Sequence, residues 1–368
     1  MKSFSLARLW AIMRKEFRHI LRDRRLLFLV TVSPAIMLTA FAYVFSFDLN
    51  PARFAIYDQD RSPQSRNLVA ALSHDRNLIV LGEVDRYEDL RQGMAAGEIK
   101  VGLVIPPGFG RDLQAGHRTS VQVLAEGSDA INASTQMAIL SSRISEWGQQ
   151  YETLDIPQPV ELRAVTLYNP DIKGRYSMVP ALLAIAMILP SMAVALALAR
   201  EKELGSFESL AATPVRAVEY IPGKLIPYII FGLISAALAV AVAVLWFKVP
   251  MKGTYLDLAG FTTLYLWATL GISILLSNFI TNQSTALRAV LLLFLVPSFF
   301  LTGLIVPIDE QARFVAFTLP ATHYVAINRA VFLKGQGWDA LGMHAFVLLS
   351  MGLFATLFTI LTFRKRVG

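Results

Sequence analysis

The sequence predicts an α-helical membrane protein with six transmembrane helices and an α/β extracytoplasmic domain inserted between the first and second spans. Three observations predict this class. The 368 residues are 55% hydrophobic, with a mean hydropathy of +0.51, which is too apolar for an ordinary soluble protein. Six apolar runs come close to or exceed the ~20 residues that a helix needs to cross the hydrocarbon core. One long segment of mixed polarity separates the first run from the other five.

The first 25 residues predict an amphipathic helix that lies in the cytoplasmic interface of the membrane. Residues 1–25 hold eight basic side chains against two acidic ones, and apolar side chains recur at helical spacing. The cations are expected to contact anionic membrane lipid. A signal peptide is the alternative, because Ala40-Phe41-Ala42 resembles a cleavage site. We favour the interfacial helix, since the basic region is too long and the apolar run continues beyond it.

Six spans place both chain ends on one side of the membrane. Outside the spans, the proposed cytoplasmic pieces hold sixteen Lys and Arg residues and the short outer loops five, which predicts cytoplasmic termini. Topology therefore accounts for most of the net charge of +7, and nucleic acid is not an expected partner. Without cysteine, a disulfide framework is excluded. The predicted spans cover residues 26–47, 178–199, 225–247, 256–280, 289–306 and 341–363, with helices 2–6 inside residues 178–363 and a cytoplasmic tail at 364–368.

Residues 48–177 have the alternating pattern of an α/β domain, with short apolar runs between amphipathic stretches. The large size of this insertion exempts it from the charge rule, and its position after the first span places it outside the cell membrane. Asp58 and Asp60 could suggest a metal site, but without a third ligand nearby we favour a strand-end turn with a helix cap. Strands are predicted at 54–57, 78–81, 101–105, 121–124 and 160–168, and helices at 63–73, 87–96 and 130–147.

Residues 200–224 form a compact polar segment between two long apolar runs. The helix that ends the preceding span is predicted to continue into water and to stop before Thr213-Pro214. Thr213 is a candidate N-cap and Pro214 a candidate first residue of a short helix over Val215–Tyr220. This helix is predicted to end near Pro222-Gly223, so that two short helices lie across the bilayer surface.

The residues of this segment carry a resemblance to a known family. Glu201-Lys202-Glu203-x-Gly205, with a later Thr-Pro and Gly-Lys, resembles the coupling loop of ABC type-2 permeases, the membrane subunits of ATP-driven exporters. The resemblance implies a cytoplasmic ABC ATPase subunit that carries ATP and Mg, with no cofactor on this chain. It also implies a second permease, as a homodimer or heterodimer, and a possible periplasmic adaptor at a bacterial inner membrane. The coupling residues it implies are Glu201, Glu203, Gly205, Glu208, Pro214 and Lys224.

The resemblance extends to both outer parts of the chain. In the domain, Glu126 stands where relatives usually have Asp, a change that leaves the expected turn intact. Residues 307–340 resemble the short re-entrant helices of the family, although relatives often carry a proline near Ala312; a loop lying on the membrane is the alternative. The motif residues are Asp58, Asp60, Ser65, Pro106, Gly127 and Asp129 in the domain, and Gly303, Pro307, Pro320 and Gly335 in the re-entrant segment.

The sequence contains no recognisable motif of a catalytic site. Gly223-Lys224 is not a nucleotide-binding loop, because Val218 and Leu225 occupy the positions of its glycine and its hydroxyl residue. The five histidines are scattered, and no span carries a charge away from its edges, which argues against an ion-coupled carrier. The sequence thus predicts a non-enzymatic permease subunit that exports an amphiphilic or drug-like substrate. A membrane-anchored sensor or scaffold, whose outer domain binds a ligand without transport, is the alternative.

Overall fold

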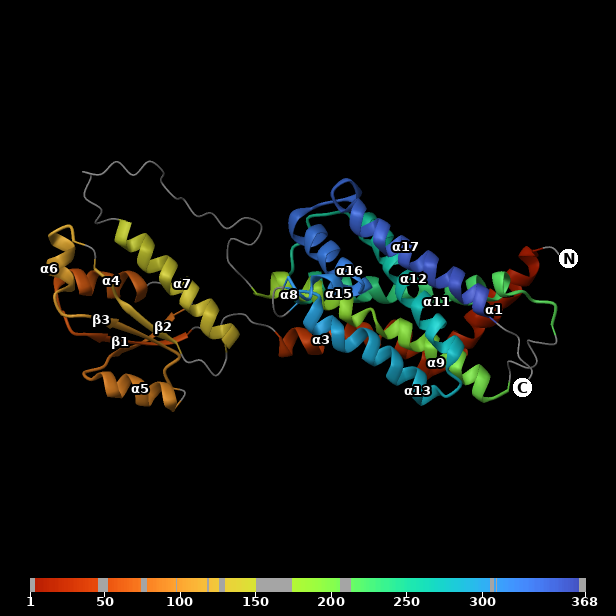
Figure 1. Ribbon diagram of the computed structural model, residues 1–368, viewed down its shortest axis with the longest axis horizontal. Coiled ribbons are helices and arrows are strands. Elements are labelled where there is room, and N and C mark those ends of the chain that lie inside the picture. The colour runs from red at the N-terminus through yellow and green to blue at the C-terminus, as the bar shows by residue number, and fades with distance from the viewer. Residues whose placement is uncertain are drawn as a thin grey trace. The chain divides into compact units, whose positions relative to one another are not determined.

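The computed structural model divides into two compact units, a helical unit of Met1–Ser46 and Thr166–Gly368 and an α/β unit of Phe47–Val165 (Figure 1). The structure describes residues 4–45, 52–73, 78–96, 98–117, 119–125, 130–149, 174–205, 213–304, 308 and 310–363.

The α/β unit contains a four-stranded mixed sheet in the order β2-β1-β3-β4. The strand β1 pairs in parallel with β2 and β3, while β3 pairs antiparallel with β4. Crossover connections through α4 and α5 join the parallel strands, as parallel pairing requires. The elements in chain order are β1 (Ala52–Asp58), α4 (Pro63–Ser73), β2 (Leu78–Glu83), α5 (Tyr87–Ala95), β3 (Val101–Ile105), α6 (Phe109–Gln114), β4 (Gln122–Ala125) and α7 (Ala130–Gly148).

Helices cover both faces of this sheet (Figure 1). Side chains alternate along β1, so Phe54 and Ile56 join a core with α4, α6 and α7, whereas Ala55 joins a second core with α5. In the first core, Phe109 stacks on Trp147 with ring centroids 6.0 Å apart. The sequence prediction missed α6, a short helix after Pro106-Pro107, and the predicted strand at 160–168 lies outside the described residues.

Within the described residues of the other unit, five helices are long and apolar enough to cross a membrane, and a sixth candidate is a bent pair. The helix α12 packs against α9, α11, α16 and α17, while the span made of α8 and α9 is almost entirely buried. The described unit is thus a helical membrane protein. The five candidates are Gly174–Glu203 (α8, Gly174–Ala186; α9, Leu189–Glu203), Ala217–Trp246 (α11, Ala217–Ala241; η2, Val242–Trp246), Tyr255–Phe279 (α12), Gln283–Leu301 (α13, Gln283–Val290; η3, Leu291–Leu295; α14, Val296–Leu301) and Trp338–Thr362 (α17).

The first span is bent rather than straight. It consists of α2 (Arg24–Thr31) and α3 (Ser33–Val44), which meet at 48°. Pro34 lies in the first turn of α3, where its missing backbone donor is tolerated. The helix α1 (Leu6–Arg22) precedes this pair and matches the amphipathic helix predicted near the N-terminus.

The prediction of a separate short helix over Val215–Tyr220 is wrong. One helix, α11, begins at Ala217 and continues through Pro222 and Pro227 into the next span. Tertiary packing overrides the local effect of the two prolines, since α11 is held by α1, α2, α3 and α12. Pro214 lies before the helix and not at its first residue.

The segment between the fifth and sixth spans contains a buried helix. The helix α15 (Arg313–Phe317) is mostly exposed, whereas α16 (Pro320–Arg329) is buried along nearly its whole length and packs against α8, α12 and α17. A π-helical turn η4 (Ala330–Lys334) follows. The motif residue Pro320 begins α16, because proline is well suited to the first helical position.

Candidate functional site: a buried charge network at residues 200–224

The end of α9, the start of α11 and the N-terminal helix α1 meet around one buried lysine. The Lys224 ammonium lies 3.0 Å from the Glu201 carboxylate and 3.2 Å from that of Glu16. Lys224 and Glu16 have no exposed side-chain surface, and Glu201 is only 13% exposed. A buried charge is tolerated only when it is paired, so these three helices depend on one another.

Two further groups complete the contacts of Glu201. The Lys15 ammonium lies 2.6 Å from one carboxylate oxygen, and the Tyr220 hydroxyl donates to the other at 2.6 Å. Lys15 is 57% exposed and therefore forms the solvent side of the network. With three internal partners, the Glu201 carboxylate is directed into the protein rather than toward a partner subunit.

A second carboxylate fixes the start of α11 to the beginning of α1. Glu219 caps α11 by accepting from the backbone N–H of Arg216 at 2.8 Å, and its other oxygen accepts from the backbone N–H of Ser5 at 2.9 Å. Arg8 lies 3.2 Å from the same carboxylate and also donates to the carbonyl of Pro214. The chain just before α11 is thus attached to the N-terminal helix.

Close packing of α1 on α11 requires a glycine at position 223. A Cβ atom built at Gly223 would lie 2.8 Å from the side chain of Ile12 and 3.4 Å from that of Leu9. Any larger residue would push the two helices apart, which would lengthen the Lys224–Glu16 ion pair one residue further along.

The last turn of α9 also contacts the connection between α12 and α13. The Lys202 ammonium donates to the carbonyls of Ser277 and Asn278 at 2.7 and 2.6 Å, a favourable place for a cation because it is a helix C-terminus. Glu203 accepts from the backbone and side-chain amides of Gln283 at 3.2 and 2.8 Å, at the start of α13.

The exposed end of this site lies just after these contacts. Glu203, Leu204 and Gly205 are exposed, with Leu204 at 66%. Gly205 has φ +69°, the left-handed conformation that favours glycine after a helix. Nothing lies within 4 Å of a Cβ built there, so its role in the described structure is conformational and not close approach. Glu208 lies outside the described residues.

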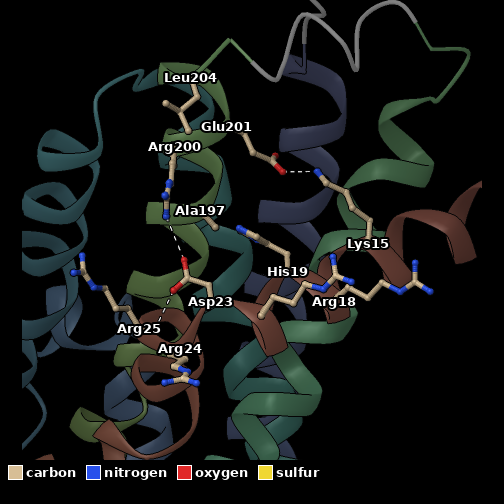
Figure 2. A pocket seen from close by; sticks show the side chains of 11 residues that line it. Lys15, Arg18, His19, Asp23, Arg24, Arg25, Ala197, Arg200, Glu201 and Leu204 are labelled. Atoms are coloured by element: carbon tan, nitrogen blue, oxygen red, sulfur yellow. Dashed lines mark hydrogen bonds and ion pairs between the residues drawn. The ribbon is translucent and has the colours of Figure 1, made fainter.

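A basic pocket of about 1000 Å³ lies beside the network, between α1, α2 and the end of α9 (Figure 2). Asp23 connects its walls, because it caps α2 and lies 3.3 Å from the guanidinium of Arg200. The backbone N–H of Leu26 lowers the pKa of Asp23 most; burial opposes this, and the N–H of Arg25 and the charge of Arg200 reinforce it. The carboxylate is therefore ionised at neutral pH.

The predicted motif residues of the α/β unit build a turn. Asp58 accepts from the backbone amides of Asp60 and Arg61 and from the Ser65 hydroxyl at 2.6 Å. Asp60 accepts from the backbone amides of Gly108 and Gly110, both at 2.8 Å, and so joins the end of β1 to the start of α6. The Pro106 carbonyl closes the same turn by accepting from Phe109. Gly127 and Asp129 lie outside the described residues.

One predicted landmark of the outer segment, Gly303, is bound by Arg329. Its guanidinium donates to the carbonyls of Gly303, Leu304 and Ser177 at 2.9, 3.4 and 3.3 Å. Gly303 and Gly335 have φ near +70° and end their helices. A Cβ at Gly335 would also lie 3.2 Å from the Lys252 carbonyl. Pro307 lies outside the described residues.

The fold brings together two histidines that lie 21 residues apart in the sequence. The Nδ1 atoms of His323 and His344 are 2.9 Å apart, a pair that the spacing of the histidines did not indicate. Across the part of the chain that the structure describes, no three His, Cys, Asp or Glu side chains are grouped as a metal site would need.

Sequence reasoning missed Glu16, Glu219 and Asp23 as members of the site. A signal for Glu16 and Asp23 was present, because they are the two acids in an otherwise basic arm of 25 residues. Glu219 stands three residues after Arg216, the position of a capping carboxylate. Their partners could not be found from spacing, since the contacts join residues about 180 to 210 positions apart.

Apolar helices of spanning length, joined at one end by a buried network of charges, define a multi-pass membrane protein. The ABC-2 family transporter proteins match residues 24–363, most of the chain. The chain therefore belongs to this family, and the resemblance inferred from the segment 200–224 is confirmed.

Curated relatives match over almost their whole length. The chain is 28% identical over 345 residues to the probable multidrug ABC transporter permease YbhS of Escherichia coli K12, with 90% of each chain covered. It is 23% identical over 338 residues to the probable multidrug ABC transporter permease YbhR of the same strain, covering 90% and 91%. It is 27% identical over 366 residues to its inner membrane transport permease YhhJ, with 96% of each covered.

Proposed function

We propose that this chain is the permease subunit of an ABC exporter, which moves an amphiphilic or drug-like substrate outward across the bacterial inner membrane. A partner ABC ATPase supplies the energy by hydrolysing ATP with Mg. Family membership and the names of the relatives support this proposal. The observation that carries it is the buried network of Lys224, Glu201 and Glu16, which connects the exposed end of α9 to two other helices.

In this proposal residues 200–224 are the coupling segment, which has a contact surface and a transmission layer. Glu203, Leu204 and Gly205 are exposed and offer the partner a charge, an apolar side chain and a turn. Glu201 and Lys224 lie behind them and bind α9 to α1 and α11. A push on the end of α9 displaces all three helices together, because separating the buried charges is costly.

The orientation follows from the distribution of basic residues. Both termini and the coupling segment are cytoplasmic, and the α/β unit is extracytoplasmic, where it receives or hands on substrate. A second permease, identical or similar, completes the pathway, and a periplasmic adaptor is a possible additional partner. The chain contributes motion rather than catalysis, and its apolar spans suit a substrate with a large apolar surface.

Co-purification tests this proposal. The tagged chain is purified in mild detergent from its native membranes, and its ATP-hydrolysing partner is identified and assayed. Glu203→Arg should release the ATPase or uncouple its activity. The matched control is Glu98→Arg, an exposed carboxylate of the α/β unit, which should leave both unchanged.

Two results would contradict the proposal. If no ATPase accompanies the wild-type chain under conditions that keep permease pairs intact, the sensor or scaffold alternative becomes the function to pursue. If Glu203→Arg and Glu98→Arg retain the ATPase and its activity equally, the contact surface has been assigned to the wrong residues. Unchanged thermal stability of Glu203→Arg in detergent shows that release of the partner is not caused by unfolding.

A further inference from the structure

We propose that the basic pocket between α1, α2 and α9 binds a phosphate-bearing anion, either a phospholipid headgroup of the cytoplasmic leaflet or soluble phosphate. This site goes beyond the proposed function, and it is more specific than the expectation that the cations of residues 1–25 contact anionic membrane lipid. Five residues on α1 and α2 supply most of its positive charge, together with Arg200 on α9. Those five residues are Lys15, Arg18, Arg22, Arg24 and Arg25.

The charge of the pocket is unbalanced. Its lining holds six Lys and Arg side chains against two carboxylates, Asp23 and Glu201. Both carboxylates already have cationic partners, Arg200 for the first and Lys15 and Lys224 for the second. The remaining guanidinium groups are exposed and so are accessible to an anion from outside these pairs.

Four of these cations have no anionic partner among the described residues. Arg18, Arg22, Arg24 and Arg25 make no side-chain hydrogen bond or ion pair to the described part of the chain. They come from two helices that meet at Asp23, and all four line the pocket. In Figure 2 the labelled Arg18, Arg24 and Arg25 extend in different directions from these helices. A planar guanidinium group can donate two hydrogen bonds to the oxygens of one phosphate group.

The other residues in and near the pocket also suit an anion that carries an apolar tail. The ring nitrogen Nδ1 of His19, another lining residue, is buried and has no hydrogen-bond partner in the described structure. Leu204 lies at the rim with 66% of its surface exposed, and Leu21 and Phe28, on the two helices that carry the arginines, are 57% and 51% exposed. Cations beside exposed apolar side chains suit an amphiphile whose headgroup is anionic.

Occupation of this pocket has a consequence for the coupling segment. Arg200 and Glu201 belong both to the pocket and to the contacts that hold α9 against α1. An anion bound among the arginines would also interact with Arg200, and would therefore change the strength of the ion pair between Arg200 and Asp23. Either change alters how firmly the end of α9 is fixed.

The test is a binding titration of the full-length chain in detergent, followed by native mass spectrometry. The probes are dioctanoyl phosphatidylglycerol, dioctanoyl phosphatidylcholine and inorganic phosphate. The variant Arg22→Gln removes a pocket cation, and Arg14→Gln is its matched control, because Arg14 is an exposed arginine of the same helix that does not line the pocket. The double variant Arg18→Gln/Arg22→Gln removes two.

We expect phosphatidylglycerol to bind about fivefold more weakly to Arg22→Gln and about 25-fold more weakly to the double variant, at roughly a fivefold change per basic residue near a lipid surface. Arg14→Gln should change binding less than twofold. Phosphatidylcholine, whose headgroup has no net charge, should bind weakly to all. If inorganic phosphate competes at millimolar concentration, a soluble anion is a sufficient ligand; if it does not, the source is the lipid.

Equal binding of phosphatidylglycerol and of inorganic phosphate to Arg22→Gln, the double variant and Arg14→Gln would overturn the proposal. So would unchanged binding of both probes combined with loss of the ATPase from Arg22→Gln during co-purification, because the cations would then form a protein-docking surface. Thermal unfolding of each variant identifies a loss of binding that comes from loss of the fold. These outcomes do not depend on whether transport is observed, so this inference can fail separately from the proposed function.

Discussion

Replacing Lys224 by methionine tests whether the buried network holds α1, α9 and α11 together. The substitution removes the charge while retaining nearly the same side-chain length, so it leaves little cavity. It also leaves the Glu16 carboxylate, which has no exposed surface, with only the 3.4 Å contact to the exposed Lys15. Removing one partner of a buried pair typically costs about 3–5 kcal/mol. We therefore expect Lys224→Met to lower the free energy of unfolding by about this amount.

The comparison with Lys15→Met makes this prediction specific. Lys15 also pairs with Glu201, at the shorter distance of 2.6 Å, but its side chain is 57% exposed and solvent screens the interaction. A surface pair contributes about 0–1 kcal/mol. Burial, and not the length of the ion pair, should decide which variant is destabilised, so Lys15→Met should unfold almost like the wild type.

The assay is equilibrium unfolding of the full-length chain in mixed micelles, with proteolysis of α1 in membranes as a local probe. The double variant Glu16→Gln/Lys224→Met should be more stable than Lys224→Met, because it removes the carboxylate left unpaired by the single change. Equal stabilities of Lys224→Met and Lys15→Met, or a double variant that is less stable than Lys224→Met, would refute the argument from burial.

Three further predictions concern single positions. Gly205→Ala should cost about 1 kcal/mol, because φ +69° is unfavourable for alanine; hydrogen exchange in the last turn of α9 should rise about fivefold, and unchanged exchange would contradict this. Asp60→Ala should speed hydrogen exchange at the backbone amide of Gly108, because this amide donates to the Asp60 carboxylate. Burial would raise the pKa of Asp60, but hydrogen bonds from a hydroxyl and three backbone amides outweigh it and lower this pKa; the stabilisation is therefore present above about pH 4 and lost as the pH falls further. A difference between Asp60→Ala and wild type that persists at low pH would disprove this assignment. Arg329→Met should cost about 1.5–3 kcal/mol in thermal unfolding, because three carbonyls lose a charged donor, whereas the exposed Arg313→Met should not.

Several features of this protein are determined by the sequence alone. The apolar runs predict the spanning helices because length and hydropathy are local properties, and the α/β alternation predicts α4, α5 and β3 to within a residue. The family was evident from a motif within residues 200–224 and is confirmed by a match over residues 24–363. The start of α16 at Pro320 also follows from local chemistry, since proline favours the first turn of a helix.

Only the tertiary structure decided how the ends of α9 and α11, at either side of residues 206–212, are held. Local rules ended a helix near Pro222, yet α11 continues through it because its neighbours fix the backbone. Glu201 and Glu203 look alike in the sequence, but the fold buries the first against Lys224 and leaves the second exposed. The physical reason is that burial and ion pairing depend on which distant helices meet, and sequence spacing carries no information about contacts between residues roughly 200 positions apart.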